Sequence, residues 1–317
     1  MIDGDMGEPF SKADQGCHSK AEKAAAEQQG YATHCGTMQV NSDSLDMEYE
    51  PAKLSVAGGT AATLFGIPFS TLDMAGICNA LLQDLPKGGG MRSVVTANVD
   101  HIVRLLHDEK LNAAYSRAWL RTIDGKPLYA YGRLLSLDLP HVAGADLVPI
   151  LLDRLDPSRH RPFFVVANDE LGEKLVNWLC VRGFEAQSIG YVAPPYGFEN
   201  LSDAQERLAA RVILHRATHV FMGLGCPRSE IWADQFRNQL GDVYILSVGA
   251  ALAFHVGSMS RAPVMVRNLG FEWLWRVFTN PKRMFRRYFI HSWPFFAIVG
   301  KDICSRLFGG KGFNIGN

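Results

Sequence analysis

A chain of 317 residues in which 47% are hydrophobic and 20% charged is typical of a soluble globular protein and is long enough to bury a substantial core. The 32 basic and 32 acidic side chains give a net charge of zero. No apolar run reaches the roughly 20 residues that a transmembrane helix needs, and no cationic start followed by an apolar segment predicts a signal peptide.

The charge is distributed unevenly along the chain. Residues 1–50 carry ten acids against three lysines, whereas residues 261–311 carry ten bases against two acids. A basic end of this kind needs an anionic partner, such as nucleic acid, a diphosphate or a membrane surface. The six cysteines form no CxxC pair and no zinc-like spacing, which fits a reducing cytoplasm.

Three segments follow from this composition. Residues 1–58 are acidic and poor in periodic apolar residues, so they predict a disordered extension. Its Asp3-Gly4-Asp5 has the DxD form with which sugar-nucleotide transferases hold a metal, but chance explains it better in such a tail. We expect an α/β core over residues 59–260 and a membrane-associating appendage over residues 261–317.

The core begins with an expected strand at residues 64–69, then a helix capped by Ser70 or Thr71 and running to Leu82. Residues 93–96 predict a strand, and Val99, Ile102, Val103 and Leu106 recur at the spacing of a helix packed by one face. Further helices are expected near 110–118, from Tyr131 to Leu135, and from 142 to Leu155.

After Pro157 the alternation becomes regular. Strands are expected at 163–167, 186–192, 219–222 and 243–248, with helices between them; Ser202 and Gln205 predict a capping box for a helix to His215. Strands alternating with helices predict a Rossmann-like, mainly parallel sheet with helices on both faces.

Two turns after predicted strands are candidate ligand sites, because ligands bind beyond the carboxyl ends of parallel strands. Asn98 is a candidate N-cap at a helix start that suits a phosphate, and Asp124-Gly125 follows the run from Leu120 to Ile123. The alternatives are an ordinary capped turn and an ordinary Asp-Gly turn.

Two later turns have the same character. The stretch from Gly223 through Gly225, Pro227 and Ser229 to Glu230 is a glycine-containing strand-to-helix turn, but it lacks the third glycine of GxGxxG. Gly249-Ala250 follows the next strand. Packing alone is the alternative explanation for both turns.

Aromatic residues stand beside arginines at 271–278 and 284–289, a composition typical of a helix in a membrane interface. A solvated basic face over a core helix is the alternative. Nucleic-acid binding by this tail is a third reading, which the clustering of the aromatics with long aliphatics and the lack of a known nucleic-acid motif disfavour.

The chain from Gly66 to Tyr288 resembles the WecG/TagA/CpsF glycosyltransferases, family 26. The matching pieces are Thr96-Ala97-Asn98, Asp124-Gly125, residues 142–148, Gly223 to Pro227, Val248 to Ala251, Arg261-Ala262-Pro263, and residues 270–274 running into Pro281, Arg283, Arg286 and Arg287.

The resemblance implies an inverting transferase that moves a sugar from a UDP-sugar to an undecaprenyl-diphosphate-linked sugar in polysaccharide or teichoic-acid synthesis. It implies a peripheral position on the inner face of the cell membrane, no metal and no cofactor. A homo-oligomer is left open.

Site residues carry over from the resemblance in three groups. Asp124 falls on the proposed general base. The diphosphate-binding arginines are Arg276, Arg283 and Arg286. The donor-binding positions are Thr96, Asn98, Gly125, His141, Gly223, Gly225, Pro227, Ser229, Glu230, Gly249 and Ala250.

Three departures from the family pattern bear on the donor sugar. The family usually has Gln, Arg and Asp where this chain has Ser229, His141 and Ala253. They favour a donor other than the N-acetylmannosamine type. They also keep open an alternative in which catalysis has been lost and the protein is a nucleotide-binding, membrane-tethered one.

Overall fold

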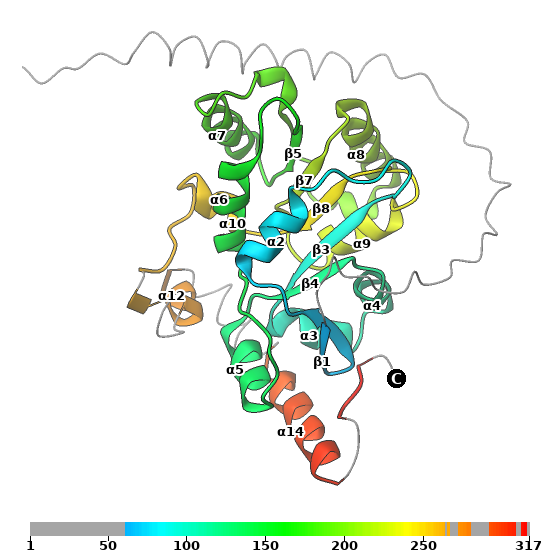
Figure 1. Cartoon of the computed structure of the whole chain (residues 1–317), viewed down its shortest axis with the longest axis vertical. Coiled ribbons are helices and arrows are strands. Elements are labelled where there is room, and N and C mark those ends of the chain that lie inside the picture. Colours follow the sequence, from blue (N-terminus) through cyan, green and yellow to red (C-terminus); the bar gives the residue numbers. More distant parts are fainter. Residues whose placement is uncertain (1–60, 264, 267–271, 280–291, 309–311, 316–317) are drawn as a thin grey trace, which may run out of the picture.

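A computed structural model describes residues 61–263, 265–266, 272–279, 292–308 and 312–315. Its centre is a six-stranded sheet of order β4-β3-β8-β7-β5-β6 in which every neighbouring pair is parallel (Figure 1). The strands are β3 (Arg92–Ala97), β4 (Leu120–Ile123), β5 (Pro162–Val165), β6 (Gly190–Val192), β7 (His219–Met222) and β8 (Tyr244–Ser247). The predicted Rossmann-like α/β fold is confirmed.

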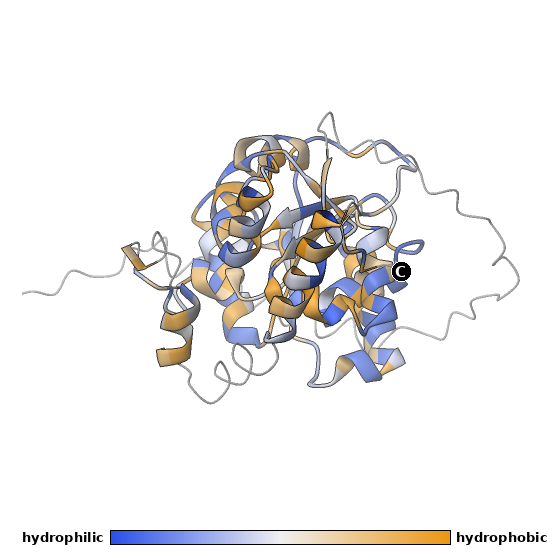
Figure 2. Cartoon of the chain, turned by 90° about the horizontal axis from the view of Figure 1, so that it is seen from below, coloured by the Kyte–Doolittle hydropathy of each residue, from blue (hydrophilic) through white to orange (hydrophobic). Residues whose placement is uncertain are grey.

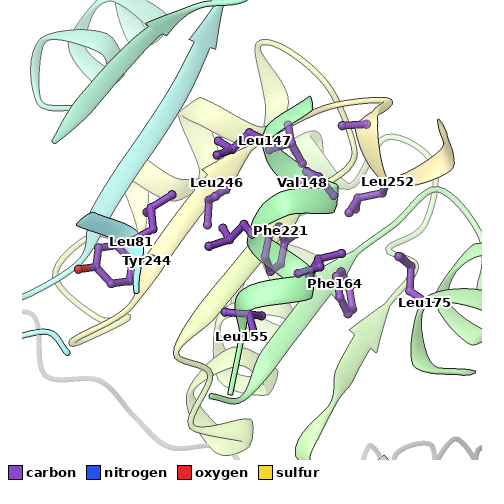
Figure 3. Packing of buried hydrophobic residues seen from close by; sticks show 14 of the residues in the cluster. Leu81, Leu147, Val148, Leu155, Phe164, Leu175, Phe221, Tyr244, Leu246 and Leu252 are labelled. Carbon is purple, nitrogen blue, oxygen red and sulfur yellow. The ribbon is translucent and has the colours of Figure 1, made fainter. Parts of the chain in front are cut away.

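Both faces of the sheet are covered, as the nearly continuous apolar strands require. On one face, Val94, Phe164, Phe221 and Leu246 belong to a core cluster with α2 (Met74–Leu81), α6 (Gly144–Arg154), α7 (Asp169–Cys180) and α10 (Ala251–His255). Figure 3 shows Phe164, Phe221 and Leu246 gathered near Leu147 and Val148 of α6.

The alternate strand residues form the opposite face. Val95 and Ile123 pack in a cluster with α3 (Val99–Leu105), α4 (Glu109–Ser116) and α5 (Lys126–Leu134). Val165, Val220 and Ile245 pack with α8 (Ser202–His215) and α9 (Arg228–Gln235). This alternation is the period of two that places successive strand side chains on opposite faces.

Several helices begin where a short polar side chain can accept backbone N–H groups. Asn98 caps α3, Asp108 caps α4 and Asn168 caps α7, each through its side-chain oxygen. The predicted N-cap at Asn98 is therefore confirmed, and it fixes the exit of β3 into α3.

Four local predictions were wrong. Residues 64–69 do not form one strand: Phe65 and Gly66 adopt positive φ, so the chain reverses between β1 (Ala61–Leu64) and β2 (Ile67–Ser70). Asp73, not Ser70 or Thr71, caps α2. The expected strand at 186–192 is a 3-10 turn, η2 (Ala186–Ser188), followed by the short β6.

The fourth error concerns α8. No side chain caps this helix, because Gln205 donates instead to the carbonyl of Glu199, in the 3-10 turn η3 (Phe198–Asn200) that precedes it.

Part of the segment after residue 260, which we call the C-terminal part, packs against the core. Helix α14 (Pro294–Leu307) buries Phe295 and Ile298 in the same cluster as α3 and the β1-β2 hairpin (Figure 1). Asp302 of α14 is fully buried and accepts hydrogen bonds from the Tyr131 hydroxyl at 2.6 Å, the Arg306 guanidinium at 2.8 Å and the Phe313 N–H at 2.6 Å. One carboxylate thus joins α5, α14 and the chain end.

The shorter helix α12 (Glu272–Thr279) stands at the edge of the molecule, and much of its ribbon is coloured hydrophobic (Figure 2). Across the described residues, no helix combines the length and apolar character needed to cross a membrane. The predicted acidic extension at 1–58, including Asp3-Gly4-Asp5, lies outside the described residues. The domain boundary near residue 260 remains a prediction.

Asp302→Ala is expected to lower the free energy of unfolding by about 3 kcal/mol, because it leaves the buried Tyr131 hydroxyl without its acceptor and Arg306 without its partner. Urea denaturation measures the change. The matched control is Asp153→Ala, which removes an exposed pair with Arg182 and should cost less than about 1 kcal/mol. Equal losses in the two variants would contradict the role given to Asp302.

Candidate active site

Four neighbouring parallel strands end at one edge of the sheet, and the predicted site residues lie there. Asn98 follows β3, Asp124 and Gly125 follow β4, Gly223 to Pro227 follow β7, and Gly249 and Ala250 follow β8. We call these residues the rim. Since β4, β3, β8 and β7 are consecutive in the sheet, the fold brings together turns that are far apart in the sequence.

The turn that carries Asp124 is held on both sides. The N–H groups of Asp124 and Gly125 donate to the Ala97 carbonyl at 2.8 and 3.3 Å. The Asp124 carbonyl lies 2.6 Å from Nε2 of His141, and Ile123 forms a parallel bridge with His141. These contacts fix the backbone of Asp124, and the residue is half-buried, so part of it reaches solvent.

His141 is a fixed neutral group. A carbonyl can only accept, so Nε2 must carry the hydrogen in this bond. Burial lowers the pKa of the imidazole below its usual value, although the bond to Asp124 opposes the effect. Above that pKa His141 supplies a hydrogen bond to the Asp124 turn rather than a positive charge for a phosphate.

Backbone N–H groups at the start of α3 already have acceptors within the protein, more of them than the sequence suggested. The Asn98 side-chain oxygen accepts the N–H groups of Asp100 at 3.0 Å and His101 at 3.4 Å, while Nδ1 of His101 accepts the Asn98 N–H at 3.0 Å. This reciprocal capping box satisfies donors that were candidates for a phosphate. A ligand at α3 would therefore meet Asn98 itself rather than a row of free N–H groups.

Three predicted donor-binding side chains lie beneath the rim. Thr96 is 4% exposed and donates to the Ser247 carbonyl at 3.1 Å, which joins β3 to β8. Ser229 is 0% exposed and donates to the Gly225 carbonyl at 3.4 Å. Glu230 is 4% exposed. In this structure their contacts are with the protein, whereas Asn98, Gly125, His141 and the turns after β7 and β8 reach solvent.

Glycine allows the turns to approach closely. A Cβ at Gly125 would lie 3.1 Å from the Asn98 Cβ, and one at Gly223 would lie 3.0 Å from the Val165 carbonyl oxygen. Gly225 and Gly249 both have positive φ, and a Cβ at Gly249 would be 3.9 Å from the Gly225 Cα. The turns after β7 and β8 therefore lie against each other with little side-chain bulk between them.

Polar side chains meet at the turn after β7: His101, Tyr115 and Glu230 are buried, and Cys226 is half-buried. We call these four residues the buried polar cluster. A ring nitrogen of His101, the sulfur of Cys226 and a carboxylate oxygen of Glu230 all lie within 4.8 Å of one another. The rings of His101 and Tyr115 are 6.2 Å apart. The cluster connects α3, α4 and the turn into α9.

Desolvation dominates the electrostatics of the cluster. Burial raises the pKa of Glu230 to about 7, because a carboxylate here would lose its water without gaining a full counter-charge. Burial also raises the pKa of the Tyr115 hydroxyl well above its usual value. One Glu230 oxygen and the Tyr115 hydroxyl have no hydrogen-bond partner among the described residues.

The sequence indicated Glu230 only as a donor contact and gave no sign that His101, Tyr115 and Cys226 form a group with it. The available signal was His101 three residues after Asn98, the position at which a side chain completes a capping box. Nothing in the spacing indicated that Tyr115 and Glu230 would meet it.

The cluster has the donor atoms of a metal site but fits a cation poorly. Nδ1 of His101 accepts a backbone N–H, so the hydrogen of the neutral ring is on Nε2. A metal at Nε2 would have to displace that hydrogen, and a metal at Nδ1 would break the cap of α3. The hydrogen-bonding pattern therefore favours a proton-holding cluster over a metal centre.

The C-terminal part approaches the rim through one arginine. Arg261 donates to the Asp146 carboxylate at 2.7 Å and to the Ala145 carbonyl at 3.2 Å, and its guanidinium lies 3.9 Å from Glu272. Asp146 and Glu272 also act on the His141 imidazole. Arg261 thus ties the first turn of α12 to the first turn of α6, near His141.

Of the predicted diphosphate-binding arginines, only Arg276 lies in a segment that the structure describes. Arg276 belongs to α12, but its side chain is not among the described ones. Arg283 and Arg286 lie outside the described residues. Their assignment remains a prediction.

Comparison with known proteins gives a family and relatives. The glycosyl transferase WecG/TagA/CpsF family matches residues 62–307. Among curated relatives, N-acetylglucosaminyldiphosphoundecaprenol N-acetyl-beta-D-mannosaminyltransferases of Staphylococcus aureus strains MRSA252 and NCTC 8325 / PS 47 are each 26% identical over 194 residues. The similarity covers 61% of this chain and 74% of each relative. The resemblance carried by the rim motifs is confirmed.

Gly125→Ala is expected to lower the free energy of unfolding by about 1–3 kcal/mol, because the new methyl group would press on Asn98 although the backbone angles suit alanine. Thermal or urea unfolding measures it. Gly300→Ala on the exposed side of α14 meets nothing within 4 Å and should leave stability unchanged or raise it by under about 1 kcal/mol. A Gly125 variant as stable as this control would contradict the prediction, because it would show that the turn moves away from Asn98 at no cost in stability.

Proposed function

This chain belongs to the WecG/TagA/CpsF family of glycosyltransferases, and from that membership we propose that it moves a sugar from a UDP-sugar to an undecaprenyl-diphosphate-linked acceptor in bacterial polysaccharide synthesis. The acceptor class is supported by the relatives, whose names specify a diphosphoundecaprenol-linked N-acetylglucosamine. The UDP-sugar donor is our inference.

The observation that carries the proposal is the placement of Asp124. It is a half-buried carboxylate at the end of β4, on a turn fixed by the Ala97 carbonyl and by His141. A base of this kind must be accessible to the acceptor and must not move as it takes the proton.

The proposed reaction is a single displacement. The acceptor hydroxyl oxygen attacks C1 of the donor sugar while its proton passes to the Asp124 carboxylate. The bond from C1 to the UDP oxygen breaks, the electron pair leaves with UDP, and the configuration at C1 inverts. One carboxylate is sufficient for this step.

The departing UDP gains negative charge and needs cations or N–H groups nearby. We propose that Arg276, Arg283 and Arg286 supply the charge from the C-terminal part. The Arg261 link between α6 and α12 supports this arrangement, because it brings the start of that basic segment next to His141 and the rim.

We propose that the protein lies on the inner face of the cell membrane. Its acceptor would carry a lipid chain, so the rim must face the bilayer surface. Exposed aromatic side chains of the C-terminal part support this orientation: Phe278, Trp293 and Phe296 are 74%, 70% and 66% exposed.

Asp124→Asn is expected to lower the rate of sugar transfer by at least about 100-fold, because the amide cannot accept the hydroxyl proton. Binding of UDP, measured by calorimetry, should remain within about threefold of wild type, since the shape of the turn is kept. Asp203→Asn, on the exposed face of α8, is the matched control. Transfer at the wild-type rate by the Asp124 variant would remove this residue from the role.

A panel of UDP-sugars tested with a short-chain lipid-diphosphate acceptor identifies the donor. We expect acceptor-dependent UDP release with a sugar other than N-acetylmannosamine, because His141 is neutral and Ser229 is buried where the family usually has Arg and Gln. UDP binding without release for any donor would favour the alternative of an inactive nucleotide-binding protein.

A further inference from the structure

The buried polar cluster connects the two halves of the rim. Cys226 belongs to the turn from β7 into α9, and Glu230 belongs to the first turn of α9. His101 belongs to the first turn of α3, next to Asn98. Their ligating atoms lie within 4.8 Å of one another, so the two turns meet through polar side chains below the surface.

Each side of the cluster is one contact away from a rim residue. On the α3 side, Nδ1 of His101 accepts the Asn98 N–H at 3.0 Å, and Asn98 lies against Gly125, the neighbour of Asp124. On the α9 side, Cys226 is itself a rim residue and directly follows Gly225, which lies against Gly249. A displacement within the cluster would therefore change the separation between Asp124 and the turn after β7.

The hydrogen bonds of the cluster suit neutral groups. His101 accepts at Nδ1 and so carries its hydrogen on Nε2. The Cys226 thiol donates to Glu230, which by itself favours the carboxylate, but burial outweighs this bond. Burial also keeps the Tyr115 hydroxyl protonated. A protonated Glu230 adds one donor without adding charge, whereas a carboxylate would be a nearly unsolvated anion.

The proposed function is the premise for assigning a role to this group. We propose that Glu230, paired with Cys226 beside His101, is a positioning residue that fastens the turn after β7 to the start of α3 and so sets the distance between that turn and Asp124.

The charged side chains around the cluster lie on α3, on β4 with its turn, and on α9, and they do not neutralise Glu230. Arg104 of α3 favours the anion but is tied to the Asp100 carboxylate at 3.2 Å. Arg121 and Asp124, on β4 and its turn, act on the Tyr115 hydroxyl of the cluster. The remaining charges of α9 are paired elsewhere: Arg228 with Glu199, and Asp234 with Arg117 and Arg237.

Ionisation of Glu230 should therefore loosen the rim. The folded pKa is raised to about 7 from an unfolded value of 4.5, so the folded state holds a proton that the unfolded state has released. The corresponding stability is fully present below about pH 4.5 and is lost as the pH rises through about 7. Transfer should decline as the pH rises through about 7, because the anion then forms inside the cluster.

The test compares pH profiles of transfer and of unfolding for wild type, Glu230→Gln and Glu230→Leu, with Glu206→Gln on the exposed side of α8 as matched control. Glutamine imitates the protonated acid and does not titrate. We expect wild-type kcat/KM to fall about tenfold between about pH 6.5 and about pH 8.5, and Glu230→Gln to lose most of that decline.

Glu230→Leu removes the polar link, so its kcat should fall at least about tenfold below that of Glu230→Gln at every pH, while its KM for the donor changes less than about threefold. The same alkaline decline in Glu230→Gln as in wild type and in the control would overturn the inference, even if Glu230→Leu fails to fold. Absence of transfer by wild type with every donor would instead contradict the proposed function, and this inference with it.

Discussion

The parallel pairing of β3 with both β4 and β8 is the constraint on which the site depends. It puts the ends of β4, β3, β8 and β7 side by side, so that turns separated by up to about half the chain meet at one edge. Both faces of the strands are buried, and a shift of one residue in register would exchange the two apolar faces. A change in the relative positions of the rim turns would therefore require the packed core to rearrange.

Two carboxylates attach the C-terminal part to this frame in different ways. Asp302 is fully buried and holds α14 against α5 with three hydrogen bonds, so α14 belongs to the folded core. Asp146 is partly exposed and holds Arg261, which leads to α12. A pair with a partly exposed carboxylate contributes less stability than a fully buried one with three hydrogen bonds. The α12 segment is thus held more weakly than α14, which suits the proposal that this part admits a lipid-linked acceptor.

The sequence predicted the sheet, the cap at Asn98 and the rim position of Asp124, because apolar periodicity and strand-to-helix turns depend on local pattern. It missed the hairpin at Phe65 and Gly66, since an apolar run gives no sign of a reversal when a non-glycine residue adopts positive φ. It could not distinguish Ser229 and Glu230, which are buried, from Asn98, which is not. Burial of a polar residue in a turn depends on which helices pack over it, and that is tertiary information.

The burial of Ser229 and Glu230 shows that the family motif at the turn after β7 contains residues that pack inside the protein as well as residues at its surface. A motif residue with a fixed spacing can contact substrate or can hold the residue that does, and spacing alone does not separate the two. Here the backbone of Gly223 and Gly225 reaches the rim, whereas Glu230 points into a group of neutral side chains shared with α3 and α4. Burying an acid carries a cost that a leucine would not incur. A polar link across two turns gives a specific distance that apolar packing does not enforce, and that specificity is the physical reason for an acid at this position.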